Sequence, residues 1–338
     1  MSAFTQSGTE NAMRWDRSSP DFMEVWYSTI NHPDTGGGLW LRYTINSPRS
    51  GDPYCELWGF YFDPENKRTF AGKQRFSADQ LGRERDDGAI VRVGDAWVSE
   101  THLEGEVHAD GGRRLGWSFD IEPSDRCFQH LPQPLRQRAE HKVSTLCAPN
   151  LSIPFTGTVS LDGETLEFER VRGSQSHRWG HAHAQSWAWA HCDSFESHPD
   201  AIFEGVAARA RFGVVPVPTM TFTYLRYDGR DIEFNSFRNA LRAKSRYEMP
   251  AWAFSAHNDE FKIVGAARAL PERMMQVLYE DPDGSTRCCA NSEIADMGIE
   301  LFRKERGVWR HIDSLTCLRT AHLEFGRMQP FVEVPVAF

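Results

Sequence analysis

The sequence predicts an all-β protein made of two antiparallel β-barrels in tandem, and three observations support this prediction. Apolar residues recur at every second position in short runs, these runs end at Gly, Pro, Asn or Asp, and helical periodicity is scarce. The runs also form two successive sets of about eight strands, spaced by roughly ten residues. Closing each set into a barrel removes the exposed edges of so large an open sheet. A single large sandwich is the alternative.

The first half of the chain contains six clear strand patterns. They cover residues 24–30, 38–45, 55–63, 68–76, 96–110 and 114–122, and turn sequences such as HPDTGGG and ADGG separate them. Residues 126–154 carry several prolines and predict a long connection with one helical turn in LRQRAEH. Asp162-Gly163, between two alternating arms, then predicts a hairpin.

The second half repeats this style of sequence. Its strand patterns are AIFEGVAARARF, TMTFTYLRYDGRDIEFNSF, DEFKIVGAARAL, MMQVLYEDPDGSTRCCAN and GIELFRKERGVWRHIDS. Asp228-Gly229 is a second hairpin signal. We therefore predict an N-terminal barrel over residues 1–184, in which residues 1–20 are a flexible leader, and a C-terminal barrel over residues 185–338.

The composition excludes several classes of protein. The chain has 338 residues, 40% of them apolar and 25% charged, with a net charge of −9, which is typical of a soluble globular protein. Its first twenty residues are polar, so neither a signal peptide nor a membrane span is expected there. The acidic balance argues against a nucleic-acid partner. Seven cysteines without a Cys-x-x-Cys pair argue against disulfides and structural zinc, so we expect a cytoplasmic protein.

The strongest chemical signal lies in residues 173–195, GSQSHRWGHAHAQSWAWAHCDSF. Nearly all even positions are small, whereas the odd positions are His177, Trp179, His181, His183, Gln185, Trp187, Trp189, His191, Asp193 and Phe195. Side chains two apart on a strand lie about 6.6 Å from one another on one face. The odd residues therefore predict one wall of an aromatic-lined cavity. A turn must interrupt the run at Gly180 or near Gln185. We therefore expect the odd residues to share one face within 177–183 and within 187–193, but not across the turn.

Several kinds of site compete for this segment. The tryptophans alone would suit an ordinary core, but four histidines need hydrogen-bond partners that an apolar core lacks. His181-x-His183 with His177 or His191 has the spacing of a metal site, yet no carboxylate lies within the motif, and we predict no metal. The chain has neither a nucleophile elbow nor a phosphate-binding loop. We therefore predict no cofactor.

Acid and base chemistry in an aromatic pocket is the remaining interpretation. His177, Asp193 and Glu204 are the candidates for proton transfer. The indoles of Trp179, Trp187 and Trp189 present π faces that stabilise positive charge. This combination suits an apolar substrate that reacts through carbocation-like states.

Motifs spread over most of the chain resemble the hydroxyneurosporene synthase (carotenoid 1,2-hydratase) family, to which fungal Diels-Alderases of polyketide pathways are similar in structure. The matching segments are FMEVWYSTINHP, GGLWLRYTI, ELWGFYFD, His177-Arg178-Trp179-Gly180 and Trp187-Ala188-Trp189. The resemblance implies two lipocalin-like barrels, a ligand cavity, no metal, and alkene hydration by protonation and water capture. By this resemblance, His177 and Trp179 correspond to site residues of the family. The family's Tyr-x-Asp has no counterpart here, and Asp193, Glu204 and Tyr224 are the candidates to replace it.

We therefore expect a cofactor-independent hydratase, isomerase or cyclase that acts on an alkene of a hydrophobic isoprenoid or polyketide. The predicted catalytic residues are His177, Trp179, Asp193 and Glu204, and the predicted substrate-binding residues are Trp187, Trp189, His191, His181, His183 and Tyr224. A non-catalytic carrier of such a molecule is the alternative. The expected partner is a hydrophobic small molecule, with peripheral membrane contact as its route of delivery.

Overall fold

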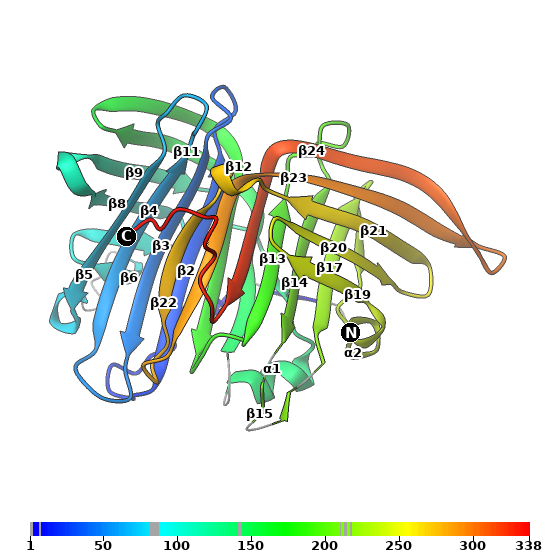
Figure 1. The fold of residues 1–338 in the computed structure, drawn as a ribbon, viewed down its shortest axis with the longest axis horizontal. Coiled ribbons are helices and arrows are strands. Elements are labelled where there is room, and N and C mark those ends of the chain that lie inside the picture. The colour runs from blue at the N-terminus through cyan, green and yellow to red at the C-terminus, as the bar shows by residue number, and fades with distance from the viewer. Residues whose placement is uncertain are drawn as a thin grey trace.

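The computed structural model describes residues 3–6, 8–81, 88–140, 144–209, 211–212, 215–216 and 218–338. The chain is nearly all β, with 63% strand and 6% helix. Its strands form two large antiparallel sheets, one from each half of the sequence (Figure 1). The predicted all-β class is confirmed.

The first sheet contains all strands up to residue 180, and its hydrogen-bonded order is β5-β4-β3-β2-β12-β11-β9-β8-β7-β6. Its strands are β1 (Phe4–Gln6), β2 (Phe22–Asn31), β3 (Gly38–Ser47), β4 (Tyr54–Phe62), β5 (Phe70–Ser77), β6 (Ala89–Val93), β7 (Ala96–Ser99), β8 (His102–His108), β9 (Arg114–Ile121), β10 (Arg126–Gln129), β11 (Ser144–Leu161) and β12 (Glu164–Gly180). Off this path, β10 pairs with β1 and β11. Short 3-10 turns occupy Ala78–Gln80 and Asp110–Gly112. The hairpin predicted at Asp162-Gly163 is confirmed, since Leu161 pairs with Glu164.

The long connection predicted over residues 126–154 is wrong as to its strands, whereas the helical turn predicted in LRQRAEH is confirmed. This region contains β10, the helix α1 (Gln133–Glu140) and the first part of β11. Pro149 does not end β11, because the ladder of β11 with β12 has register shifts between Cys147 and Asn150 and between Asn150 and Ile153. Such irregularities allow a strand to hold a residue that lacks an N–H donor.

The second sheet has the order β18-β17-β14-β13-β24-β23-β21-β20-β19, and β22 also pairs with β23. Its elements are β13 (Ser186–Cys192), β14 (Ile202–Arg209), β17 (Met220–Tyr227), β18 (Arg230–Glu233), α2 (Phe237–Arg242), β19 (Lys244–Glu248), β20 (Ala251–His257), β21 (Phe261–Arg268), a 3-10 turn (Pro271–Arg273), β22 (Met275–Glu280), β23 (Thr286–Glu305) and β24 (Val308–Arg327). A separate ribbon pairs β15 (Arg211–Phe212) with β16 (Val215–Pro216). The hairpin at Asp228-Gly229 is confirmed. The chain passes between the sheets in residues 181–185, where the predicted division at residue 184 falls.

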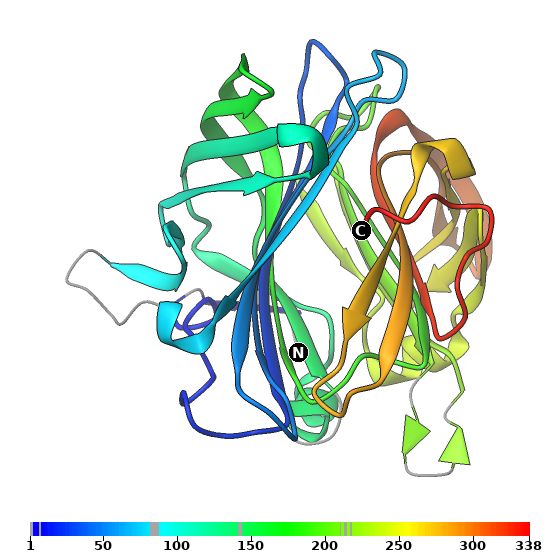
Figure 2. The ribbon, with the colours of Figure 1, turned by 60° about the vertical axis from the view of Figure 1, so that its left-hand side comes forward.

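The two sheets pack against each other, as Figure 2 shows. Each sheet encloses its own apolar core, and a third cluster, with Trp40 and Trp58 from one sheet and Trp187 and Trp189 from the other, lies between them. Gly38 permits the closest approach, because a Cβ there would lie 2.5 Å from both the Cβ and the carbonyl oxygen of Glu293. Of the predicted site residues, Trp187 and Trp189 belong to this interface.

The described part of the expected flexible leader, residues 3–6 and 8–20, instead packs on the first sheet. Strand β1 pairs with β10, and Asn11 and Trp15 are buried. Trp26 Nε1 donates to the carbonyl oxygen of Asn11 at 2.9 Å, and the backbone N–H of Trp15 donates to Glu24 at 2.9 Å. The expectation missed these contacts because the partners are scattered along the chain.

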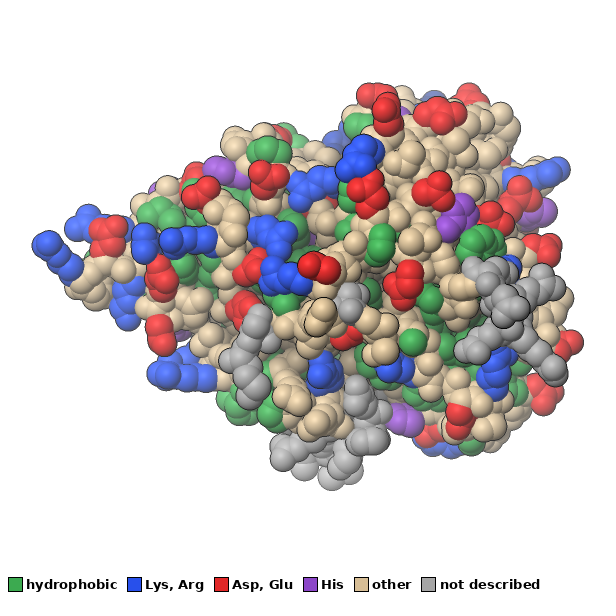
Figure 3. All heavy atoms as spheres, turned by 180° about the vertical axis from the view of Figure 1, so that it is seen from behind, with side chains coloured by type: hydrophobic (Ala, Val, Ile, Leu, Met, Phe, Trp, Pro, Cys, Tyr) green, Lys and Arg blue, Asp and Glu red, His purple; other side chains and the backbone are tan. Residues whose placement is uncertain are grey.

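The outer surface mixes the two signs of charge. On the face drawn in Figure 3, outside the atoms shown in grey, acidic and basic side chains lie next to one another. In the part of the chain that has been placed, no helix combines the length and the apolar character needed to cross a membrane.

Candidate functional site

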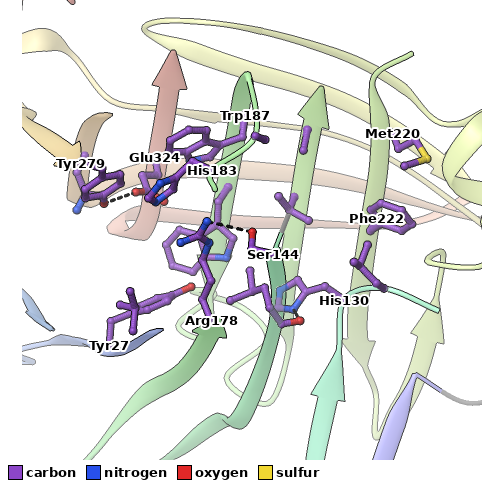
Figure 4. A pocket seen from close by; sticks show the side chains of 18 of the residues that line it. Tyr27, His130, Ser144, Arg178, His183, Trp187, Met220, Phe222, Tyr279 and Glu324 are labelled. Carbon is purple, nitrogen blue, oxygen red and sulfur yellow. Dashed lines mark hydrogen bonds between the residues drawn. The ribbon is translucent and has the colours of Figure 1, made fainter. Parts of the chain in front are cut away.

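A cavity of about 320 Å³ lies between the two sheets (Figure 4). The first sheet lines it with Tyr27, Trp40, Arg42 and Arg178. The second sheet and the preceding connection contribute Trp187, Trp189, Tyr279, Glu324 and His183. The wall is therefore aromatic, with a few charged and titratable groups among the rings.

His177 and Trp179 do not share this cavity with Trp187 and Trp189, so that prediction is wrong. His177 Nε2 lies 2.9 Å from Glu24 Oε1, and its ring stacks on Trp26, which belongs to the core of the first sheet. Trp179 lines a separate pocket of about 730 Å³ together with His181.

The physical reason is the alternation of side chains along β12. Neighbouring residues point to opposite faces of a strand, and Arg178, between His177 and Trp179, lines the cavity between the sheets. The parity holds within 187–191, where Trp187 and Trp189 line the cavity and Trp189 stacks with His191. Across residues 181–185 the pattern changes from even to odd: Arg178 of β12 faces the cavity, whereas Trp187 and Trp189 of β13 face it. The reason is that β12 and β13 belong to different sheets.

His181 and His183 lie in this connection and point to different places. His181 Nδ1 lies 2.5 Å from the carbonyl oxygen of Asp21, whereas His183 Nδ1 lies 2.6 Å from Asp281 Oδ1. The two rings therefore do not act as neighbouring ligands. Among the described residues, no group of three or more His, Cys, Asp or Glu side chains has a geometry that could hold a metal ion.

His183 and Asp281 form an ordered hydrogen-bonded pair at the cavity wall. The backbone N–H of His183 also donates to Asp281 Oδ1, at 3.0 Å, and the imidazole stacks against Trp187 and Tyr279. Burial, reinforced by the positive charge of Arg178, lowers the pKa of His183 to about 3 despite the carboxylate. The ring is therefore neutral near pH 7. Because Nδ1 donates to Asp281, the lone pair lies on Nε2.

A second carboxylate at the wall, Glu324, is held by three donors. The Tyr279 hydroxyl donates to Oε1 at 2.6 Å and the Cys289 thiol at 2.9 Å, while Trp187 Nε1 donates to Oε2 at 3.4 Å. Burial, followed by Cys289 and Glu324, raises the pKa of Tyr279 well above its ordinary value. This phenol keeps its proton and orients the carboxylate.

Tyr27 is a further protonated phenol on the opposite sheet. Its ring meets Trp189 edge to face at 5.8 Å. Burial, together with the negative charges of Glu204 and Glu324, raises the pKa of Tyr27 well above its ordinary value. Figure 4 shows Tyr27 and Arg178 rising from the first sheet toward His183.

Glu204 lies at the centre of a buried hydrogen-bond network beside the cavity. Its Oε1 lies 2.6 Å from both His130 Nε2 and Trp189 Nε1, and its Oε2 lies 2.9 Å from His191 Nδ1. Burial alone would raise the pKa of Glu204, but the bonds from His130 and His191 outweigh it and lower the pKa to about 2. Glu204 is therefore an ionised acceptor that fixes Trp189 in the wall.

Of two further residues predicted for the site, Asp193 lies at the edge of this network and Tyr224 lies outside it. Asp193 Oδ2 accepts from Ser152 at 2.8 Å and lies 3.9 Å from His191 Nε2. Burial alone would lower the pKa of His191, but Asp193 and Glu204 raise it to about 9. Tyr224 packs in a separate cluster with Phe128, and its hydroxyl donates to Asp231 at 2.6 Å.

The raised pKa of His191, beside Asp193 and Glu204, predicts how the stability of the fold depends on pH. Its pKa is about 9 in the folded chain and about 6.5 when unfolded, so its stabilising effect is complete below pH 6.5 and is lost as the pH rises to 9. We expect the free energy of unfolding to fall over this window by up to about 1.4 kcal/mol per pH unit from this group. Urea unfolding at pH 6.5, 7.5 and 9 measures it. His191→Gln should flatten the slope, and an equally steep slope in that variant would contradict the assignment.

Gly326 lies against the indole of Trp187 in the cavity wall, so adding one methyl group at this position tests how tightly the wall is packed. Gly326 pairs with Trp187 across β24 and β13, and a Cβ there would lie 2.2 Å from the indole Cε2 and Cζ2 atoms. We expect Gly326→Ala to displace the indole and lower the free energy of unfolding by about 1–3 kcal/mol. Urea unfolding and tryptophan fluorescence measure both effects. Gly298→Ala, where a Cβ meets no atom within 4 Å, is the control and should change little; equal losses in both variants would contradict the steric reason.

The fold and site define a class of two-sheet, lipocalin-like β-proteins with an aromatic cavity between the sheets. The sequence matches the tocopherol cyclase-like family over residues 97–327, and the chain belongs to that family. An uncharacterized protein of Mycobacterium tuberculosis, represented in two strains, is 26% identical over 321 residues, which cover 93% of this chain and 88% of that protein.

Two solved structures share the fold. Kievitone hydratase from Nectria haematococca superposes with a TM-score of 0.53 at 9% identity, covering 96% of each chain. A protein from Nitrosomonas europaea, provisionally named AttH, has a TM-score of 0.51 at 12% identity, covering 96% of this chain and all of that one. The narrower resemblance to hydroxyneurosporene synthase stays a prediction.

Proposed function

We propose that the chain catalyses a hydratase- or cyclase-type reaction, in which an O–H group adds to a carbon–carbon double bond of a hydrophobic substrate in the cavity between the sheets. The observation that carries the proposal is the Asp281–His183 pair, whose ring lies in an aromatic wall with its Nε2 lone pair free of the carboxylate. The name of the tocopherol cyclase-like family and the hydratase among the proteins of like fold support the same reaction class.

Proton transfer in this reaction needs one base and one acid. His183 Nε2 accepts the proton of the attacking water or hydroxyl group, and Asp281 holds the ring in the required tautomer. Tyr27, a protonated phenol at the same cavity, donates the proton that the second carbon of the double bond receives. One O–H bond and the π bond of the alkene break, and one C–O and one C–H bond form. The proton on His183 then returns to Tyr27 through water, which restores both residues.

These assignments differ from the predicted catalytic set. Glu204 and Asp193 hold His191, and Glu204 also holds His130 and Trp189, so we propose a positioning role for both carboxylates. His177 is fully buried against Glu24, and we propose that it orders the core of the first sheet. Trp187 and Trp189 remain in the proposed substrate-binding wall.

Reaction in heavy water tests the proposed function. The purified chain is incubated in D₂O with a panel of prenylated phenols, linear polyenes and polyenoic acids, and the products are analysed by mass spectrometry. Ring closure adds one carbon-bound deuterium by exchange with solvent, whereas hydration adds the elements of water. Either product from the native chain, but not from His183→Gln, supports the proposal. Tight binding of a panel member without any product contradicts it and favours the carrier.

A further inference from the structure

Arg42 is a buried cation in the cavity wall, and none of the carboxylates that the structure describes pairs with it. Its side chain is on β3, the residue is 4% exposed, and Nε donates to Thr44 Oγ1 at 3.0 Å. Its guanidinium lies over the rings of Tyr279 and Trp58, at 4.3 and 4.7 Å from their centroids. Within the described ranges, Nη1 and Nη2 of Arg42 have no hydrogen-bond acceptor and no ion-pair partner.

Arg178 is a second cation at the same wall. Its Nη2 donates to Ser144 Oγ at 3.0 Å and to the carbonyl oxygen of Ala182 at 2.9 Å, and its Nη1 lies 3.3 Å from Met23 Sδ. These partners are neutral. As for Arg42, the part of the chain that the structure covers places no carboxylate within 4 Å of this guanidinium.

The acidic side chains near the cavity are occupied by other donors. Glu324 accepts from Tyr279, Cys289 and Trp187. Asp281 accepts from His183 and has Arg287 Nη2 at 3.6 Å. The chain therefore buries two guanidinium groups at one cavity with no carboxylate in contact with either of them in the described residues. Asp281 and Glu324 act on Arg178 only at longer range. Burying guanidinium N–H groups without an anionic acceptor is unfavourable unless a ligand supplies the anion.

We propose that Arg42 and Arg178 bind an anionic oxygen group of the substrate, a carboxylate or an ionised enol, so that the substrate is a hydrophobic acid. The inference rests on the proposed function, because it takes this cavity as the substrate site. A guanidinium presents paired N–H donors that match two oxygen atoms of one anion. The aromatic rings over Arg42 hold its plane in place and leave its Nη donors for the ligand.

The two ends of the cavity orient such a molecule. Figure 4 shows Arg178, His183 and Tyr279 toward one side and Phe222 and Met220 toward the other. The anionic group therefore lies beside His183, and the apolar body extends toward Phe222. Two positive charges also repel a free carbocation, so the cavity favours a path in which negative charge develops on oxygen. This differs from the carbocation-like path expected from the indoles.

A matched pair of ligands tests the proposal: farnesoic acid and its methyl ester, which share one apolar chain and differ in charge. Isothermal titration calorimetry at pH 8 measures the dissociation constant of each. We expect the native chain to bind the acid about 10- to 100-fold more tightly than the ester. Arg42→Gln and Arg178→Gln should each weaken binding of the acid by about tenfold or more and leave binding of the ester unchanged.

Two further variants make the test specific. Arg246→Gln changes an exposed arginine of β19, whose side chain is 86% exposed, and should leave both dissociation constants unchanged. If Arg42→Gln does not fold, Arg42→Lys keeps the charge but loses the paired donors, and an intermediate affinity for the acid supports the proposal.

The outcomes separate the two claims. Equal binding of acid and ester, or an acid preference that survives in both arginine variants, overturns the inference and leaves the proposed function standing. Failure of both ligands to bind contradicts the cavity as a site for hydrophobic molecules, and so overturns both claims.

Discussion

Replacing His183 with Gln is expected to lower turnover by about 10²- to 10⁴-fold, the usual effect of losing a general base. The reason is geometric: His183 places a neutral imidazole against the rings of Trp187 and Tyr279, and glutamine cannot accept a proton there. The measurement is the rate of deuterium incorporation into whichever panel member reacts. The dissociation constant for that substrate should change much less than the rate, because the apolar contacts remain.

A second His–Asp pair in the chain supplies the control. His198 Nε2 lies 3.1 Å from Asp313 Oδ2 in a partly exposed position of the second sheet. His198→Gln removes the same kind of pair and should leave the rate unchanged. A native rate in His183→Gln, or an equal loss in both variants, would mean that His183 is not the base.

Replacing Glu204 with Gln is expected to cost about 3–5 kcal/mol of unfolding free energy, the range seen when one partner of a buried ion pair is removed. Glu204 accepts from His130, His191 and Trp189 in a site closed to water, and the amide of glutamine turns an N–H group toward one of these donors. Urea unfolding at pH 7 measures the loss.

Glu169→Gln is the matched control for this substitution. Glu169 is an exposed residue of β12, so its replacement should change the unfolding free energy by less than about 0.5 kcal/mol. A loss of under 1 kcal/mol in Glu204→Gln would show that the network contributes little to stability. The carboxylate of Glu204 would then serve a purpose other than the stability of the fold.

The strands were predictable from sequence because their signals are local. Alternation of apolar residues follows from the pleat of a strand, and Asp162-Gly163 and Asp228-Gly229 each supply the positive φ that a tight hairpin turn needs. Strand β10 and the first part of β11 were missed. In β11, irregular pairing accommodates Pro149, and such pairing has no short-range sequence signal.

The site was predictable only in part, because it depends on which face of each strand meets the other sheet. Within β13 the parity correctly grouped Trp187 with Trp189, but in β12 it selected His177 over its neighbour Arg178. Asp281 lies in a sequence of acidic, proline and glycine residues that reads as a surface turn, 98 positions from His183. Only the packing of the two sheets brings them together.

Because the cavity has one wall from each half of the chain, any occupant is also a link between those halves. Its binding free energy counts toward keeping the sheets docked, and at a ligand concentration 100 times the dissociation constant this amounts to about 2.7 kcal/mol. Neither half alone offers a complete surface to the molecule, so affinity appears only after the two have assembled. Where the two halves of the free chain unfold in separate calorimetric transitions, the ligand should therefore merge these transitions into one cooperative transition.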